Sequence, residues 1–306
     1  MTDTAPGPPD DGPHDLRLPD GRRLAYAEYG APDGAPVLYF HGFPSSRREA
    51  GLMHADALAA GARIIAPDRP GYGDSDDAPE RQLADWANDC AALATALALK
   101  RFAVIGVSGG GPYALACARF LPERLPGQLA GCTLVCPLGA IYRDDQLQQM
   151  NPAARTSLLV GRQPAWLASL VYGGPTTAVL AHWPDLVERF RHIGAPPADL
   201  GVLAAGDTAA ILNRTIADAM QRGAPGARRD LALYTHDWGI DFGQIHAPIR
   251  IWHGQADGTV PIEHARWLAA QLPDADLVEL PGEGHYSVPI RYAQQILEEL
   301  LGQSSR

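Results

Sequence analysis

Short apolar segments alternate with helix-like segments along most of this chain. The apolar segments have the length and composition of buried strands and occupy residues 36–40, 63–67, 102–107, 131–137, 249–253 and 275–280. Helical patterns lie between or after them, at residues 48–60, 80–98, 109–120, 261–272 and 289–301. Parallel strands need crossover helices that cover the sheet. The alternation therefore predicts an α/β fold with a mostly parallel sheet and helices on both faces.

An antiparallel hairpin is expected at the start of this sheet. Residues 15–18 and 22–30 have strand patterns, and they flank the turn sequence Pro19-Asp20-Gly21. Two strands joined by such a turn form a hairpin. Together with the six later segments, the hairpin brings the expected sheet to eight strands.

The strand–helix rhythm stops over residues 138–230 and then resumes. This region has helix-like patterns, several prolines and four aromatic side chains, Trp166, Tyr172, Trp183 and Phe190. We interpret it as a helical lid inserted into a core made of residues 15–137 and 231–306. The four aromatic residues either form the core of the lid or line a substrate pocket, and the sequence favours neither. The acidic, Pro-rich residues 1–14 are expected to be a disordered tail.

Composition excludes several classes of function. The 306 residues are 46% hydrophobic, enough for one large core. A net charge of -10 argues against binding to nucleic acid, which favours a basic face. No apolar run approaches the roughly 20 residues that span a bilayer, so no membrane association is expected. The N-terminus also lacks the basic start and apolar stretch of a signal peptide.

The four cysteines, Cys90, Cys117, Cys132 and Cys136, lie in apolar segments without a CxxC pair. We expect buried thiols in a reducing compartment and therefore a cytoplasmic protein. No zinc-ligand spacing occurs among cysteine and histidine residues, so no metal site is expected.

Residues 103–115, AVIGVSGGGPYAL, have the pattern of a strand, a turn of small residues and a helix. One interpretation is a phosphate-binding turn, because residues 109–114 fit G-x-G-x-x-A. A dinucleotide site also needs an acidic residue after the next strand. That strand ends in Val135-Cys136-Pro137, and no Walker-type lysine is present. The phosphate interpretation is therefore disfavoured.

The other interpretation is a nucleophile on a sharp turn. Gly106, Ser108 and Gly110 fit G-x-S-x-G, in which the flanking glycines remove side chains that would clash across a strained strand-to-helix turn. The amides at the start of the following helix, from Gly109 on, suit a developing oxyanion. A helix-capping role for Ser108 is the simpler alternative.

A nucleophilic serine needs a base and an acid that orients the base. The carboxyl ends of parallel strands lie at one edge of a sheet, which restricts the search. Asp257 follows the strand at 249–253, and His285 follows the strand at 275–280. Glu283 and Asp237 are rivals to Asp257, but Glu283 is too close in sequence to His285 to reach the far nitrogen of its ring.

With these residues in place, the chain resembles the α/β-hydrolase superfamily, in the serine branch with a helical lid. The resemblance extends from about residue 15 to the end and rests on HGFP (41–44), DRPGYGDSD (68–76), GVSGG (106–110), HGQADGTVP (253–261) and PGEGH (281–285). It implies that Ser108 is the nucleophile, Asp257 the acid and His285 the base. It also implies an oxyanion hole formed by the backbone amides of Phe43 and Gly109. An aspartate nucleophile is absent, which disfavours epoxide hydrolysis and dehalogenation.

The resemblance implies a hydrolase that cleaves a small or medium, mostly apolar ester, lactone or thioester through an acyl-enzyme. We expect a monomer or homodimer that acts on a small-molecule substrate without metal or organic cofactor. Carbon–carbon bond hydrolysis, perhydrolysis and peptide cleavage use the same triad and remain alternatives. The peptidase branch usually has tryptophan where Gly109 stands. An alternative of another class is a ligand receptor or sensor with slow turnover.

Other polar residues near the motifs are expected to have structural roles. His41 is interpreted as a support for the oxyanion loop, and Asp68 and Asp74 as residues that shape their own loop. His253 is expected at a strand end and His264 on a helix surface. His236 and Asp237 are interpreted as part of a turn.

Overall fold

A computed structural model describes residues 14–163, 187–188, 191 and 194–303. Its eight strands form one sheet in the order β1-β2-β4-β3-β5-β6-β7-β8. The strands are β1 (His14–Arg17), β2 (Arg23–Gly30), β3 (Ala35–Phe40), β4 (Ala62–Pro67), β5 (Phe102–Val107), β6 (Leu129–Val135), β7 (Ile249–Gly254) and β8 (Ala275–Leu280). β1 and β2 are antiparallel, as are β2 and β4, and the remaining pairs are parallel. The expected α/β fold and eight-stranded sheet are confirmed.

The expected hairpin connects β1 to β2. Gly21 has a φ of 89°, a left-handed value that glycine adopts at little cost. The backbone N–H of Arg22 donates to Oδ1 of Asp20 at 3.0 Å, which closes the turn. The register then pairs Leu16 with Leu24. The Pro19-Asp20-Gly21 turn therefore sets the register of this edge of the sheet.

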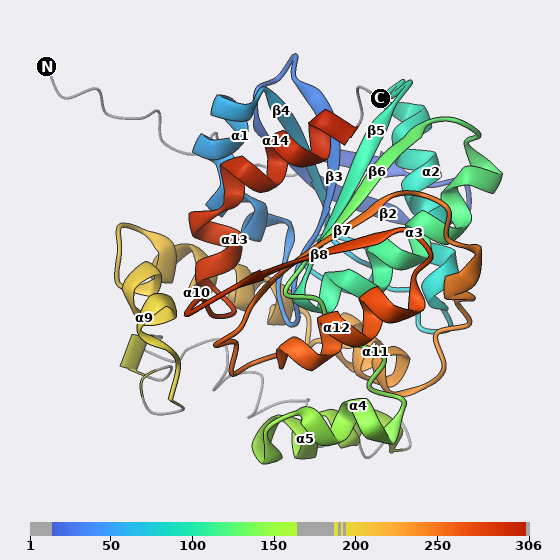
Figure 1. Ribbon diagram of the computed structural model, residues 1–306. Coiled ribbons are helices and arrows are strands. Elements are labelled where there is room, and N and C mark those ends of the chain that lie inside the picture. The colour runs from blue at the N-terminus through green and yellow to red at the C-terminus, as the bar shows by residue number, and fades with distance from the viewer. Residues whose placement is uncertain (1–13, 164–186, 189–190, 192–193, 304–306) are drawn as a thin grey trace, which may run out of the picture.

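Helices cover both faces of the sheet (Figure 1). One face packs against α2 (Trp86–Ala96), α3 (Gly111–Arg124) and α12 (Ile262–Gln271), and the other packs against α1 (His54–Ala60) and α14 (Ala293–Gln303). All six residues of the central strand β5 are buried. Burial on both faces explains why the sequence of this strand is continuously apolar and does not alternate.

The remaining described helices lie mainly in connections between strands. They are α4 (Asp144–Gln149), α5 (Pro152–Leu159), α9 (Pro197–Leu203), α10 (Thr208–Met220), α11 (Pro225–Thr235) and α13 (Ser287–Arg291), with 3-10 turns η1 (Arg47–Met53), η2 (Leu83–Asp85), η3 (Ser108–Gly110), η4 (Val160–Arg162) and η5 (Phe242–Gln244). The closing helix expected at 289–301 is thus divided into α13 and α14. No helix in the described ranges is long and apolar enough to cross a membrane.

The expected lid contributes α4, α5, α9 and α10, and helix α11 runs across its expected boundary at residue 230. The division of the chain into tail, core and lid stays a prediction. Trp166, Tyr172, Trp183 and Phe190 lie outside the described residues. The four cysteines have free, buried thiols.

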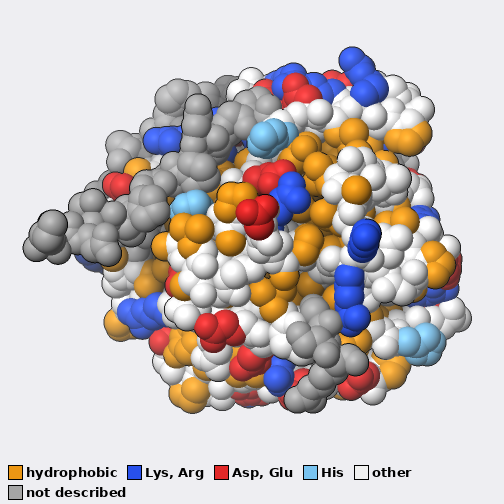
Figure 2. Space-filling model, turned by 90° about the horizontal axis from the view of Figure 1, so that it is seen from above, with side chains coloured by type: hydrophobic (Ala, Val, Ile, Leu, Met, Phe, Trp, Pro, Cys, Tyr) orange, Lys and Arg blue, Asp and Glu red, His pale blue; other side chains and the backbone are white. Residues whose placement is uncertain are grey.

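Basic and acidic side chains are interspersed with hydrophobic ones on the face seen in Figure 2. On the part of this face that the structure describes, neither sign of charge forms a large continuous area. The net negative charge of the chain is therefore not concentrated there.

One side chain lies elsewhere than expected. His264 in α12 is fully buried, not on the helix surface. The backbone N–H of Gly139 donates to its Nδ1 at 3.1 Å, and its Nε2 lies 2.9 Å from the carbonyl oxygen of Gln146. The prediction was wrong because the segment after β6 packs over this side of α12, and helical periodicity alone does not reveal that segment.

Candidate active site

Ser108 stands at the sharp turn between β5 and α3. Its φ is 53°, which is uncommon for a residue with a side chain. A Cβ on Gly110 would lie 2.1 Å from the carbonyl oxygen of Phe40, and a Cβ on Gly106 would lie 2.5 Å from that of Gly110. Only glycine fits either position. The turn holds the Ser108 side chain at the carboxyl end of the sheet, although α3 itself begins at Gly111, after the 3-10 turn.

The structure brings Ser108, His285 and Asp257 together in one row. Nε2 of His285 lies 3.0 Å from Oγ of Ser108, and Nδ1 lies 2.7 Å from Oδ2 of Asp257. The other oxygen of Asp257 accepts from the backbone N–H groups of Thr259 and Val260, each at 2.8 Å. The loop after β7 therefore fixes the carboxylate, and the carboxylate orients the ring.

The charges in this row support one another. Burial disfavours the charged forms of Asp257 and His285, but the attraction between the carboxylate and the imidazolium outweighs that cost. Burial raises the pKa of Asp257, yet His285 and His253 bring it below its ordinary value. Burial lowers the pKa of His285, yet Asp257 brings it above its ordinary value. A ring of this kind can accept a proton from Ser108 while the carboxylate stabilises the resulting cation.

The rivals to Asp257 lie elsewhere. Nδ1 of His285 is within hydrogen-bond distance of Asp257. The carboxylate of Glu283 faces Arg291, and Oδ1 of Asp237 accepts from the backbone N–H of Gly239 at 2.9 Å. The expected turn at 236–237 is therefore found.

The residues expected to form an oxyanion hole are adjacent. A Cβ on Gly109 would lie 2.7 Å from Cβ of Phe43. The carbonyl of Ser108 accepts from the N–H of Leu138 at 3.0 Å, and the carbonyl of Gly42 accepts from Nη2 of Arg69 at 2.9 Å. In a trans peptide the N–H points opposite to the C=O. Holding these two carbonyls therefore also fixes the directions of the Gly109 and Phe43 amides.

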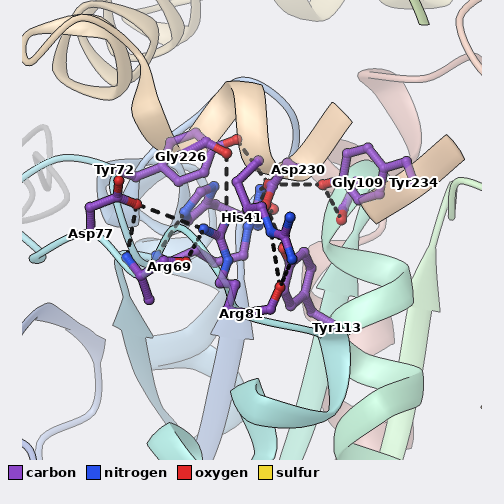
Figure 3. A network of polar contacts seen from close by, with 12 residues as sticks. His41, Arg69, Tyr72, Asp77, Arg81, Gly109, Tyr113, Gly226, Asp230 and Tyr234 are labelled. Carbon is purple, nitrogen blue, oxygen red and sulfur yellow. Dashed lines mark hydrogen bonds and ion pairs between the residues drawn. The ribbon is translucent and has the colours of Figure 1, made fainter. Parts of the chain in front are cut away.

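A buried network of polar side chains lies next to the loop that carries Phe43 (Figure 3). It was not predicted from the sequence. Its centre is Asp230 of α11, a fully buried carboxylate. It accepts hydrogen bonds from Arg69, Arg81, Tyr72, Tyr113 and Tyr234. Burial raises the pKa of Asp230, but Arg69 and Arg81 outweigh this and lower it to about 2. The carboxylate is therefore ionised at neutral pH.

The network contacts both expected oxyanion donors through their neighbouring peptides. Arg69 donates to the carbonyl oxygens of His41 and Gly42. Tyr234 donates to the carbonyl of Gly109 at 2.8 Å. Nε2 of His41 accepts from the N–H of Arg69, at 3.3 Å. The expected support role of His41 fits these contacts, but the sequence carried no signal for Asp230.

The loop that carries His285 is also held by a residue that was not predicted from the sequence. Asp199 of α9 is buried and accepts from the backbone N–H groups of His285, Tyr286 and Ser287, at 2.8–2.9 Å. A carboxylate that accepts three backbone N–H groups fixes the course of the backbone strongly. The loop is thereby anchored to a helix of the expected lid.

Asp68 and Asp74 have contacts beyond their own loop. Oδ2 of Asp68 accepts from the N–H of Asp74 at 3.2 Å, as expected for a residue that shapes the loop. Both carboxylates also pair with the buried Arg47. They therefore connect the loop to η1.

Ser108 and His285 line a mostly apolar pocket. Its other walls come from the oxyanion loop, η1, α10 and α13 and include Phe43, Leu52, Met53, Leu212, Ile216 and Ile290. A larger cavity of about 520 Å³ lies at the β1–β2 turn and the start of α2. Its charged groups include the Arg22–Asp89 ion pair, and none of the residues in the row lines it. The Ser108 pocket, and not this cavity, therefore contains the candidate active site.

Cys136 lies beside the row. Its Sγ and ligand atoms of Asp257 and His285 are all within 4.8 Å of one another. Burial raises the pKa of the Cys136 thiol well above its ordinary value, whereas metal ligation uses the thiolate. The histidine nitrogens are also within hydrogen-bond distance of Ser108 and Asp257. The arrangement therefore suits proton transfer better than metal binding.

Comparison with known proteins identifies the family. The sequence model of the family described as alpha/beta hydrolase fold matches residues 35–291. The chain belongs to the α/β-hydrolase family. A non-heme haloperoxidase from Rhodococcus erythropolis is 26% identical over 87% of the chain and 90% of that protein. A non-heme chloroperoxidase from Streptomyces lividans is 37% identical over 38% of the chain and 41% of that protein.

A third relative of this α/β-hydrolase is longer. The dihydrolipoyllysine-residue acetyltransferase component of an acetoin cleaving system from Pseudomonas putida is 27% identical, and the match covers 92% of the chain but 66% of that protein. Among solved structures, a bromoperoxidase from Bacillus anthracis has a TM-score of 0.71 at 19% identity. The superposition covers 96% of this chain and 100% of the bromoperoxidase. An esterase from Rhodococcus sp. has a TM-score of 0.69 at 20% identity, with 96% of the chain and 98% of the esterase covered. At these identities, the two structures show that the chain shares their fold.

Proposed function

We propose that this α/β-hydrolase is a serine hydrolase that cleaves a small or medium, mostly apolar carboxylic ester, lactone or thioester. The observation that carries the proposal is the hydrogen-bonded row of Ser108, His285 and Asp257 at the carboxyl end of the parallel strands. The apolar pocket beside Ser108 supports the substrate class.

In the first half-reaction, Oγ of Ser108 attacks the substrate carbonyl as Nε2 of His285 takes its proton. The carbonyl π electrons move to oxygen, and the amides of Phe43 and Gly109 donate to that oxyanion. The tetrahedral intermediate then collapses, and the leaving alcohol or thiol takes the proton from His285. Asp257 stabilises the imidazolium between these two transfers.

In the second half-reaction, water replaces the leaving group. His285 takes a proton from a water molecule as the oxygen of that water attacks the acyl carbon. The bond between the acyl carbon and Oγ then breaks, and His285 returns the proton to Ser108. Losing one oxyanion donor typically costs about 3 kcal/mol of transition-state stabilisation. The amide of Phe43 is therefore expected to supply a substantial part of the transition-state stabilisation.

The test uses Ser108→Ala and short-chain p-nitrophenyl esters. The variant is expected to lose hydrolysis and covalent labelling by a fluorophosphonate. Thr156→Ala, which removes a hydroxyl on α5, serves as the control and is expected to retain both. Persistent labelling of Ser108→Ala contradicts the proposed nucleophile. A stoichiometric burst without further turnover in the unaltered protein favours a sensor over an enzyme.

The haloperoxidase and chloroperoxidase relatives favour a second candidate function. In the second half-reaction, an oxygen of hydrogen peroxide attacks the acyl carbon in place of water. The bond to Oγ of Ser108 then breaks and a peracid leaves, with the same proton transfers through His285. The experiment adds hydrogen peroxide to the ester assay and measures peracid by its oxidation of iodide. A peracid yield that depends on Ser108 supports perhydrolysis, and carboxylic acid as the sole product contradicts it.

A further inference from the structure

The Ser108 pocket contains a second carboxylate. Glu49 lies in η1, directly after the loop that carries Phe43, and its exposed fraction is 8%. It lines the same pocket as Ser108 and His285. The proposed mechanism gives this side chain no task.

The hydrogen bonds of Glu49 are unevenly divided between its two oxygens. Oε1 accepts from Oη of Tyr39 at 2.8 Å and from the N–H of Gly42 at 2.9 Å. Oε2 accepts only the longer contact of that same N–H, at 3.2 Å. An ionised carboxylate has about four acceptor sites. Oε2 therefore has acceptor capacity that these contacts do not use.

Glu49 also has no ion-pair partner among the described residues, although arginines are close in sequence. Arg47 pairs with Asp68 and Asp74, and Arg48 pairs with Asp218. Buried charges in proteins are normally paired. An unpaired carboxylate on the wall of a pocket points to a positive charge that arrives with the ligand.

The carboxylate is close to the nucleophile. The position that a Cβ of Gly42 would occupy lies 3.2 Å from Oε2 of Glu49 and 3.6 Å from Cβ of Ser108. Both side chains thus border the same spot. A substrate group one to three bonds from the carbonyl carbon is within reach of Oε2 when that carbon lies at Ser108.

A carboxylate at this place favours the protonated form of His285, whose pKa it helps to raise, but it disfavours the oxyanion of a neutral substrate. The transition state places negative charge on the carbonyl oxygen, and a nearby anion repels it. A cation on the substrate offsets that repulsion and pairs with the carboxylate. The apolar side chains of Leu52, Met53, Leu212 and Ile216 line the same pocket, which suits an aliphatic body.

We propose that Glu49 makes the pocket selective for aliphatic acyl substrates that carry an ammonium group next to the scissile carbonyl. This inference rests on the proposed serine hydrolase function and specifies its substrate class. The competing role for Glu49 is purely structural, as an acceptor that ties the N–H of Gly42 to Tyr39. Glu49→Gln separates the two roles, because glutamine keeps an acceptor oxygen and a similar volume but carries no charge.

The experiment compares three methyl esters from pH 6.5 to pH 8, because the pKa of His285 is raised and this range includes both the neutral base and the protonated amine. They are leucine methyl ester, its neutral isostere methyl 4-methylpentanoate, and methyl 2-hydroxy-4-methylpentanoate, each corrected for its uncatalysed rate. The unaltered protein is expected to prefer the leucine ester over both others in kcat/KM by at least about tenfold, as expected when a buried polar group loses its partner. Glu49→Gln is expected to remove that preference, chiefly through a lower kcat/KM for the leucine ester. Glu28→Gln, which alters a carboxylate on β2 paired with Arg63, is expected to keep the preference.

Each contrary result has one meaning. Equal hydrolysis of the three esters by the unaltered protein overturns the inference alone. A preference for the hydroxy ester equal to that for the leucine ester also overturns it, because a neutral donor then suffices. A Glu49→Gln variant that slows on all three esters equally assigns Glu49 to the structural role. Absence of both turnover and fluorophosphonate labelling in the unaltered protein overturns the proposed function, and this inference with it.

Discussion

Oδ2 of Asp199 accepts a hydrogen bond of 2.9 Å from the backbone N–H of His285. The two residues belong to different parts of the chain, a helix before α10 and the loop after β8. A Cβ on Gly284 would lie 2.4 Å from the same carboxylate oxygen, so the two segments are in close contact. The placement of the His285 ring therefore depends on a residue 86 positions earlier.

Asp199→Ala is expected to impair both stability and hydrolysis. Three backbone N–H groups lose a charged acceptor in a buried place, which we expect to cost about 2–4 kcal/mol of unfolding free energy. The loosened loop should lower kcat more than it raises KM, because it mispositions the base and not the substrate. Urea unfolding and steady-state ester kinetics measure the two effects. Asp199→Asn, which keeps one acceptor oxygen, should lie between the variant and the unaltered protein. An unchanged kcat in Asp199→Ala contradicts the assigned support of His285.

Gly110→Ala is expected to abolish hydrolysis. Its Cβ would lie 2.1 Å from the carbonyl oxygen of Phe40, at the end of β3, so β3 and the Ser108 turn must separate. Cores tolerate such overpacking poorly, and the cost is typically about 1–3 kcal/mol or more. The control is Gly302→Ala in α14, where nothing lies within 4 Å of the new Cβ. Alanine favours a helix over glycine by about 1 kcal/mol, so this control should be neutral or slightly stabilising. Thermal unfolding and p-nitrophenyl ester hydrolysis of both variants test the prediction, which fails if Gly110→Ala remains fully active.

The row of Ser108, Asp257 and His285 could be expected from the sequence because each residue follows a strand with a strong local signal. Parallel strands place their carboxyl ends at one edge, so three local signals combine into one long-range prediction. Asp230 and Asp199 had no such signal. Each lies in a helix that the sequence assigns to the insert or its boundary, and each acts on a loop more than 80 positions away.

The wrong placement of His264 has the same origin. The helical pattern of α12 is local, but the segment around Gly139 and Gln146 that buries its histidine comes from far earlier in the chain. Periodicity distinguishes the apolar face of a helix from the polar one. It does not show that a segment distant in the sequence covers a polar position of the helix and forms hydrogen bonds with it.

Asp230→Asn is expected to be strongly destabilising at neutral pH. Arg69 and Arg81 keep their buried charges while their shared anion disappears, and breaking a buried pair in this way typically costs about 3–5 kcal/mol. The variant should also lose hydrolysis at temperatures where it is folded, because Arg69 then no longer holds the carbonyl of Gly42 firmly. Tyr234→Phe removes only the hydroxyl that donates to Gly109 and Asp230 and should cost about 1 kcal/mol.

The same carboxylate predicts a pH dependence with a definite sign. The pKa of Asp230 is lowered from 3.8 to about 2 in the folded protein. Its contribution to stability is therefore present above pH 4, and it is lost as the pH falls from about 4 to 2, because the unfolded chain binds the proton first. The shift corresponds to about 2 kcal/mol. Between pH 5 and pH 2.5, urea unfolding should show a loss of unfolding free energy that is smaller by about 1.5 kcal/mol in Asp230→Asn. An equal drop in both proteins contradicts the assignment.

His264 predicts a second pH dependence, at higher pH. Burial lowers the pKa of His264 from 6.5 to about 4, so the folded protein holds the ring neutral. The neutral ring can accept from the N–H of Gly139 at Nδ1 and donate to the carbonyl of Gln146 from Nε2. The unfolded chain takes up a proton below pH 6.5. Stability is therefore full above that pH and falls as the pH decreases towards 4, by about 2–3 kcal/mol at pH 4.5. Glutamine can replace both hydrogen bonds without titrating. Urea unfolding at pH 7 and pH 4.5 should thus show a loss of stability in the unaltered protein that exceeds the loss in His264→Gln by this amount. If the two proteins lose stability equally over this range, His264 is not held neutral by its burial.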